Sequence, residues 1–132
     1  MPYPETWLKA AVETATGWQA HPLVAPEQAP VPYAVYGRQA TAPEHALDPA
    51  LQASINPSGT FALELYAPSY SAAKEAAAAV RAALRNFIGT ASGVTIRHCL
   101  LTDERDGDVI FFDGQDRQTY VVEMTLDIRW QE

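Results

Sequence analysis

One stretch near the C-terminal end constrains the fold more than any other part of the chain. In TYVVEMTLDIRW, residues 119–130, apolar side chains recur at every second position. This period of two predicts a β-strand with one face in a core and the other face polar. The inward set is Tyr120, Val122, Met124, Leu126, Ile128 and Trp130, and the outward set is Val121, Glu123, Thr125, Asp127 and Arg129. The chain is therefore expected to fold around a half-buried sheet.

A strand followed by an alanine-rich helix is predicted from ELYAPSYSAAKEAAAAVRAAL, residues 64–84. Alternating apolar residues indicate a strand over 59–67, which Pro68 interrupts because it lacks a backbone N–H. Ser69 or Ser71 then serves as the N-cap of the helix. The apolar face of this helix is expected to comprise Ala73, Ala76, Ala77, Val80, Leu84, Phe87 and Ile88, with Gly89 as the stop.

The remaining elements are predicted from breaks in the sequence as much as from its periods. Residues 4–15 form a helix with Pro4 in its first turn and Gly17 at its end. Four prolines make residues 18–32 an extended connector. The other expected elements are strands over 33–41 and 94–102, a loop over 42–58 with a helical turn at 49–53, turns over 103–108 and 111–118, and a short strand between those turns. Both a binding loop and a plain connection fit the long loop.

These elements predict an α+β fold with the order α-β-β-α-β-β. We expect an antiparallel or mixed β-sheet of about four strands, with two helices packed on one face. The chain has 132 residues, of which 48% are hydrophobic and 19% charged. This length and composition suit a single domain over residues 1–132 with one core.

Composition excludes several classes of protein. The sequence holds no run of 18 apolar residues, which argues against a membrane-spanning helix, and MPYPETWLKAAVE lacks the pattern of a secretion signal. The formal net charge of -7 argues against tight wrapping on nucleic acid, because phosphate binding needs concentrated lysine and arginine. Cys99 is the only cysteine, which excludes an internal disulfide and fits a reducing compartment.

No set of residues has the spacing of a known catalytic or metal site. His21, His45 and His98 are scattered without the pairing that metal ligands show. Cys99 lies on a predicted strand with no motif around it, as expected of a buried small hydrophobe. Nucleophile-elbow and phosphate-binding glycine motifs are absent from the sequence. We therefore predict no enzyme activity, no cofactor and no metal.

An acidic cluster is the strongest charge feature of the chain. It comprises Asp103, Glu104, Asp106, Asp108, Asp113 and Asp116, within 14 residues. The cluster fits a solvated hairpin whose turns use Asp-Gly at 106–107 and 113–114, or an acidic surface that faces a partner or a pore. A divalent ion bound by Asp103, Asp106 or Asp108 is a third interpretation, although the order of an EF-hand loop is missing.

Taken together, four segments of the chain resemble one protein family. They are APEQAPVPYAVYG (25–37), HALD (45–48), ELYAPSYSAAKEAAAAVRAAL (64–84) and YVVEMTLDI (120–128). In this order and spacing they resemble the tail completion or tail terminator proteins of long-tailed bacteriophages and prophages. The resemblance spans nearly the whole chain. It rests on patterns of structure, because the family has no catalytic residues to compare.

The resemblance implies a structural role in the virion, with assembly in the host cytoplasm. Family members form homo-oligomeric rings, often hexamers, at the head-proximal end of the tail tube. They end tube polymerisation and join the tail to the head connector, and DNA passes through the lumen without specific binding. The implied partners are further copies of the chain, the tail tube protein and a connector or neck protein, without a membrane. Candidate contact residues are Glu44, His45, Leu47 and Asp48 in the long loop, together with the acidic cluster.

Two other functions stay open at this point. The first is a head–tail connector or neck protein of similar fold. The second is a small divalent-metal-binding enzyme or regulator that uses the acidic cluster.

Overall fold

The computed structural model describes residues 3–26, 29–42, 57–111 and 118–131. In chain order its elements are α1 (Pro4–Thr16), β1 (Gln19–Pro22), β2 (Tyr33–Ala42), β3 (Ser58–Ala67), α2 (Tyr70–Leu84), β4 (Gly89–Ala91), β5 (Val94–Asp106), β6 (Ile110–Phe111) and β7 (Gln118–Gln131). Neither α1 nor α2 is long and apolar enough to cross a membrane.

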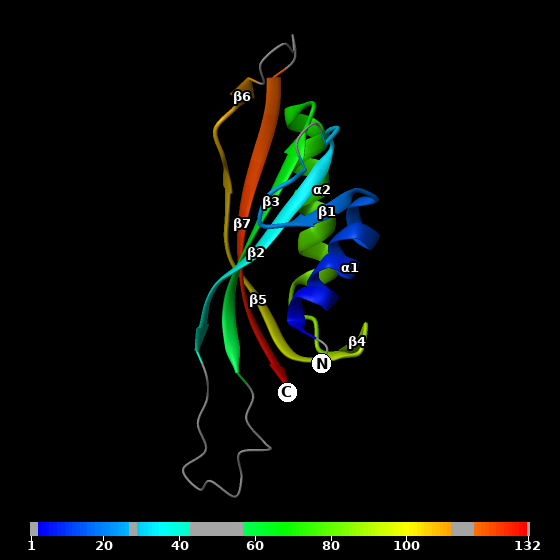
Figure 1. Ribbon diagram of the computed structural model, residues 1–132, viewed down its shortest axis with the longest axis vertical. Helices are drawn as coiled ribbons and strands as arrows, with labels where there is room; N and C mark the ends of the chain where they lie inside the picture. The colour runs from blue at the N-terminus through cyan, green and yellow to red at the C-terminus, as the bar shows by residue number, and fades with distance from the viewer. Residues whose placement is uncertain (1–2, 27–28, 43–56, 112–117, 132) are drawn as a thin grey trace, which may run out of the picture.

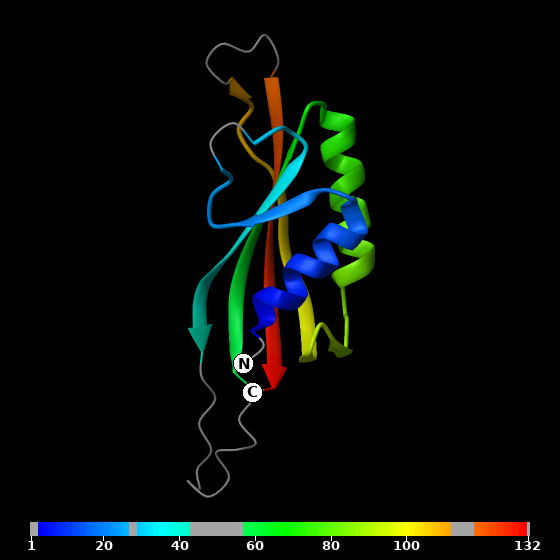
Figure 2. The ribbon, with the colours of Figure 1, turned by 45° about the vertical axis from the view of Figure 1, so that its right-hand side comes forward.

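The strands form one mixed, curled sheet. Six of them lie side by side in the order β1-β2-β3-β7-β5-β4, and the two-residue β6 pairs with the beginning of β7. The pair β1–β2 is parallel and the other pairs are antiparallel. Both helices lie on the same side of this sheet (Figures 1 and 2).

The predicted sheet of about four strands in the order α-β-β-α-β-β is wrong. The additional strands are β1 and β4, which have four and three residues, whereas the two-residue β6 lies where a short strand was predicted between the two turns. Strands this short show no period in the sequence, so they could not be recognised by alternation. The first of them lies inside the proline-rich connector, at the edge of the sheet, where a proline is tolerated.

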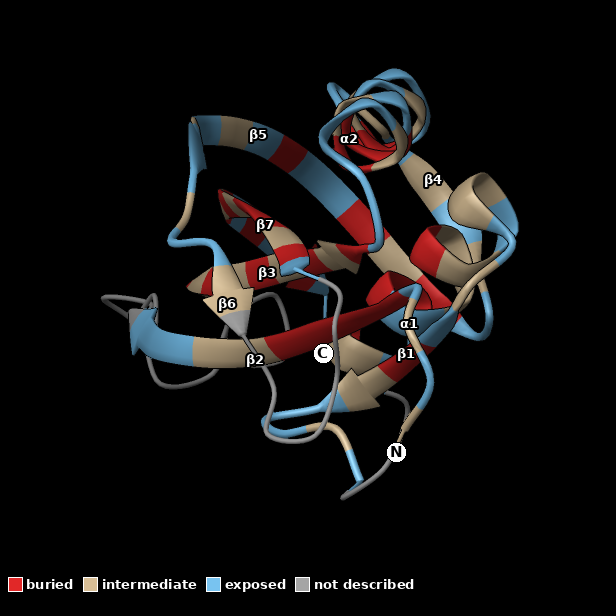
Figure 3. Ribbon diagram, turned by 90° about the horizontal axis from the view of Figure 1, so that it is seen from above, coloured by how far each residue is buried: buried red, intermediate tan, exposed pale blue. Residues whose placement is uncertain are grey.

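Irregular pairing accompanies the curl of the sheet. The register shifts between Arg38 and Ala40 on β2, and twice on β5, between Ile96 and His98 and between Leu101 and Asp103. Such bulges bend a strand and increase its twist. Seen from above, the sheet curves from β5 through β7 and β3 to β2, with both helices on its inner side (Figure 3).

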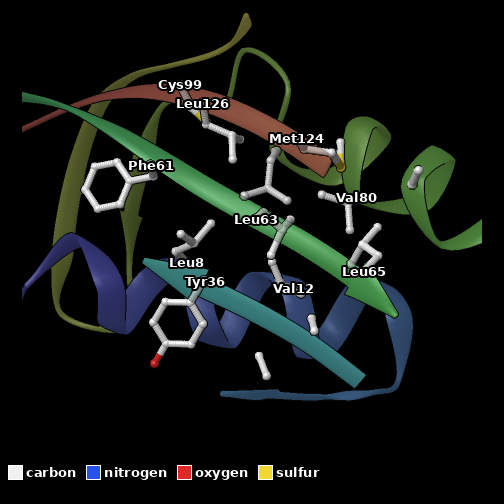
Figure 4. Packing of buried hydrophobic residues seen from close by; sticks show 14 of the residues in the cluster. Leu8, Val12, Tyr36, Phe61, Leu63, Leu65, Val80, Cys99, Met124 and Leu126 are labelled. Atoms are coloured by element: carbon white, nitrogen blue, oxygen red, sulfur yellow. The ribbon is translucent and has the colours of Figure 1, made fainter. Parts of the chain in front are cut away.

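The core lies between the inner face of the sheet and the two helices (Figure 4). The predicted inward residues of β7 are confirmed from Val122 to Trp130, each at most 2% exposed, whereas Tyr120 is half-buried. From α2, the predicted residues Ala73, Ala76, Ala77, Val80 and Leu84 are buried. The alanines carry little side-chain bulk, so this helix can pack close to the sheet.

The first helix confirms its predicted caps and is fixed to the sheet by two carboxylates. Gly17 takes a left-handed conformation (φ 73°), and its N–H donates to the carbonyl of Glu13 at 2.9 Å. The side chain of Glu13 accepts a hydrogen bond from the N–H of Ala20 in β1 at 3.1 Å. Glu5 pairs with Arg38 of β2 at 2.5 Å. Helix α1 is thus bonded to both β1 and β2, the two strands at one edge of the sheet.

The beginning of α2 agrees with the prediction, whereas its end differs. Ser69 is the N-cap, and its side chain accepts from the N–H of Ala72. The helix nevertheless ends at Leu84 and not near Gly89, because the chain turns at Asn86 (φ 60°), whose N–H donates to the carbonyl of Cys99 at 3.0 Å. Ile88, expected in the apolar face, is 70% exposed.

Candidate assembly surface

The sheet face that points away from the helices carries mainly polar side chains on its central strands. We call it the outer face. Its residues alternate with the core residues along each central strand. On β3 they are Ser58, Thr60, Ala62, Glu64 and Tyr66, and on β7 they are Glu123, Thr125, Asp127 and Arg129. The face is wet, as expected of a sheet covered on one side only.

A shallow hollow of about 550 Å³ lies on the outer face near the end of β2. It spans four neighbouring strands, with Ala40 from β2, Thr60 from β3, Asp127 from β7 and Leu100 from β5 among its lining residues. The hydroxyl of Thr60 donates to Asp127 at 3.1 Å. Leu100 is 42% exposed, which leaves an apolar side chain in water on an otherwise polar surface. The hollow therefore offers a shallow contact surface on this face.

Charged side chains connect β5 and β7 across the same face. Arg105 donates from Nε to Glu123 at 3.0 Å and lies 3.9 Å from Asp103. The Arg105 side chain is 69% exposed, so solvent screens these pairs and each contributes little to stability.

Aromatic side chains cover the other end of the outer face. Tyr33 and Tyr66 stack with ring centroids 4.9 Å apart, and His21 meets the edge of Tyr33. The Tyr66 hydroxyl donates to Glu64. Burial, together with this hydrogen bond to a carboxylate, raises the pKa of Tyr66. Tyr66 therefore stays neutral across the physiological range.

The acidic residues 103–106 do not form the predicted turn, because β5 continues through Asp106. They are divided between the two faces of the sheet. Asp103 is level with Thr125 on the outer face, whereas Glu104 and Asp106 are level with the core residues Met124 and Val122.

On the inner side, α2 neutralises two of these acidic residues. Arg81 donates to Glu104. Lys74 and Tyr70 each donate to Asp106 at 2.8 Å. Hydrogen bonds from Lys74 and then Tyr70 hold the pKa of Asp106 below its usual value, and the bond to Asp106 raises the pKa of Lys74. These two carboxylates are therefore part of a polar seam between α2 and β5.

The other predicted contact residues have different outcomes. Asp108 is exposed just beyond β5. Glu44, His45, Leu47, Asp48, Asp113 and Asp116 lie outside the described residues. The metal interpretation of the acidic cluster is weakened, because Asp103 and Asp106 lie on opposite faces and Asp106 already pairs with a lysine. Within the described ranges, no three histidine, cysteine or acidic side chains are grouped to hold a metal ion.

Cys99 is a core residue whose thiol keeps its proton at neutral pH. It is completely buried, and burial raises its pKa to about 12. A thiol becomes a nucleophile by losing its proton, so this one is inert in the folded chain.

Sequence patterns did not reveal the exposed apolar residues of this surface. Leu23 and Val24 follow β1 and are 73% and 76% exposed, and Leu23 has a left-handed backbone (φ 65°), which is uncommon for leucine. The Leu23 side chain lies over Gly37, where an added Cβ would come within 2.9 Å of it. In the sequence, Leu23 and Val24 lie between Pro22 and Pro26, and this pattern did not predict that their side chains are exposed.

Comparisons with known proteins support one family. The family model for tail completion protein gp17 matches residues 6–131. Among solved structures, 24 chains match. One of them, from a structure titled virion of native gene transfer agent (GTA) particle, is 15% identical, with a TM-score of 0.58 over 96% of this chain and 92% of that chain. At this identity the likeness shows a shared fold. No curated protein matches the chain.

Proposed function

The chain belongs to the tail completion protein gp17 family, and we propose that it forms a ring at the head-proximal end of a phage tail tube. Family membership confirms the resemblance inferred from the sequence and makes the chain a structural protein of a phage tail. The match over residues 6–131 is the observation that carries the proposal, because it covers all but the first two residues of α1, the whole of α2 and the sheet. The ring ends polymerisation of the tube and joins the tail to the head connector.

The geometry of the sheet supports a ring built from identical copies. A closed ring requires a heterologous contact, in which one patch meets a different patch on the next copy. The sheet has two dissimilar sides, one ending in β1 and the other in β4. In our proposal six copies of this single-domain chain form the ring, which also contacts the tail tube protein and a connector or neck protein.

The charge of the chain is compatible with a lumen through which DNA passes. The net charge is -7, and like charge prevents a phosphate backbone from sticking to a wall. In the same proposal the chain assembles in the host cytoplasm and remains at the head-proximal end of the virion tail.

Deletion of the gene tests the terminator function. Electron microscopy of particles without this chain should show tubes that exceed the normal length, because nothing stops polymerisation. Normal tails that fail to join heads would instead assign the chain to the neck, and would contradict tube termination. Complementation with the wild-type gene is the control, and it should restore tails of uniform length.

Light scattering of the purified chain, alone and with tail tubes, tests the ring. We expect a mass several times that of the 14.4 kDa chain, at least when tubes are present. A chain that stays monomeric in both samples would rule the ring out.

A further inference from the structure

Two long strands have a backbone edge without a strand partner in the described structure. The short β1 covers β2 only at Tyr33–Tyr36, which leaves residues 37–42 open. On the other side β4 covers β5 only at Val94–Ile96. Beyond it the carbonyl of Cys99 accepts from the N–H of Asn86, so the open part of β5 extends from Leu100 to Asp106. Such edges present unpaired backbone groups that favour addition of another strand.

The directions of these two strands suit each other. The neighbours β2, β3, β7 and β5 are joined by three antiparallel pairs, so β2 and β5 run in opposite directions. If β5 of one copy lies beside β2 of the next copy, the two strands pair antiparallel. The alternation of the sheet then continues from one copy to the next without a break.

The two open edges also lie at the same height in the sheet. Across the sheet, the pairing register aligns Ala40 of β2 with Thr60 of β3, Thr60 with Asp127 of β7, and Asp127 with Leu100 of β5. The upper end of the open segment of β2, at Gly37, is level with Asp103 of β5 by the same register. When one copy is related to the next by rotation about an axis parallel to the strands, residues keep their position along the strand direction. The open edge of β5 in one copy can therefore lie beside the open edge of β2 in the next copy. By the same register residues 104–106 are level with residues 34–36, which β1 covers, so the two edges are both open at residues 37–40 of β2 and 100–103 of β5.

The side chains at these edges favour contact between unlike edges. Leu100 is 42% exposed and Ala40 is exposed, and both line the hollow on the outer face. Pairing at equal height places them opposite each other, where the small Ala40 leaves room for Leu100. Two β5 edges bring the Asp103 carboxylates of both copies together, whereas residues 37–42 contain no acidic side chain.

We propose that the partner of the open β5 edge is a second copy of this chain, joined through residues 37–40 of its β2. The contact rests on the proposed ring and specifies how neighbouring copies are held. Each copy uses one edge on either side, so the contact is heterologous and can close on itself. Backbone hydrogen bonds supply the affinity, and the row of Leu100 and Ala40 sets the register.

A cysteine pair tests the contact in assembled particles. In the variant Ala40→Cys/Leu100→Cys, the two thiols of one chain are separated by β3 and β7, about 14 Å at the usual strand spacing. This exceeds the span of about 7 Å that a disulfide can bridge, so any 40–100 disulfide must join two chains. Oxidation should give a ladder of covalent multimers that ends at the size of the ring. The native Cys99 is buried and stays silent.

Control variants show whether the ladder of multimers comes from the contact between β2 and β5 of neighbouring copies. Glu75 is exposed on α2 and belongs to neither open edge segment, so Ala40→Cys/Glu75→Cys should give no ladder. Neither Ala40→Cys nor Leu100→Cys alone should form dimers, and a dimer of either single variant would overturn the pairing of unlike edges. In the wild-type chain, amide hydrogens of 37–40 and 100–103 should exchange at least about tenfold more slowly in the ring than in the dissociated chain.

The outcomes separate this contact from the function on which it rests. An intact ring without the 40–100 disulfide, and without slowed exchange at the two edges, would overturn the edge pairing and leave the ring standing. A chain that stays monomeric on tail tubes would overturn both. If the double variant does not assemble, hydrogen exchange in the wild-type ring decides the question.

Discussion

Successive residues of β7 point to opposite faces of the sheet, and the two faces differ in burial. From Val122 to Trp130, every second residue is at most 2% exposed, whereas Asp127 and Arg129 between them are exposed. Val121 is an exception on the outer face, because it is buried and lies close to Gly107. The inner face is constrained by packing against two helices. The outer face has no such constraint, so its residues are free to serve contacts with other chains.

Thiol chemistry should show the largest difference between the faces. Cys99 is buried with a pKa of about 12, whereas the next residue, Leu100, is exposed on the outer face. A Leu100→Cys thiol with an ordinary pKa has a thiolate fraction about a thousandfold higher at neutral pH. We expect a thiol reagent to modify it at least that much faster than Cys99. Labelling followed by mass spectrometry measures both rates.

The control for this comparison is the chain in denaturant, where both thiols should react at similar rates. Rapid labelling of Cys99 in the folded wild-type chain would contradict its burial beneath the sheet.

Two neighbouring substitutions on β7 should separate the faces in stability. Leu126 is completely buried, and Leu126→Ala should lower the free energy of unfolding by about 2–5 kcal/mol, because it leaves a cavity. Asp127→Asn on the outer face should change it by no more than about 0.5 kcal/mol. Denaturant unfolding of the dissociated chain measures both values. Similar losses for the two variants would show that the outer face also carries the fold.

The sequence predicted the parts of the fold that repeat. Five residues of β7 and five of α2 were assigned correctly to the core, because burial on one face imposes a period over many residues. The short strands β1 and β4 could not be found in this way. Charge misled the prediction for β5, because DERDGD has the composition of a turn. Cations on α2 neutralise two of those acidic residues, and a contact between distant elements has no local signal.

The assembly surface was less predictable than the fold. The four segments that resemble the family indicated a phage tail protein. They reflect how strands and helices pack, so they did not identify the residues that contact other chains. Open edges follow from the order of strands in the sheet, which depends on pairings such as β3 with β7 across the length of the chain. Leu100 became a candidate only when register placed it level with Ala40.

Double-mutant cycles should show a smaller difference between ion pairs on the two sides. Arg38 pairs with Glu5 on the inner side at 2.5 Å, and its guanidinium lies 4.8 Å from the ring centroid of Trp130. Its side chain is 26% exposed, so solvent screens this pair less than an exposed one, and we expect a coupling energy of about 1 kcal/mol. For Arg105 and Glu123 on the outer face, the coupling should be below about 0.5 kcal/mol.

The variants Arg38→Met, Glu5→Gln, Arg105→Met and Glu123→Gln, with the two doubles, complete these cycles by denaturant unfolding. A larger coupling for the outer pair would reverse the assignment. Added salt should weaken the outer pair more than the inner one.

The smallest effect should come from the polar seam at Asp106, and it should depend on pH. Its pKa is lowered in the folded chain by hydrogen bonds from Lys74 and Tyr70, so the carboxylate stabilises the fold above the unfolded pKa of about 4. That contribution is lost as pH falls through the folded pKa. Asp106→Asn should therefore lower the melting temperature slightly at pH 7, and the difference from the wild type should disappear once the pH is below the lowered folded pKa. The exposed Asp108→Asn serves as the matched control, with no difference expected at either pH. An equal loss for Asp106→Asn at both pH values would mean that the seam acts through packing, because protonation would then leave its contribution unchanged.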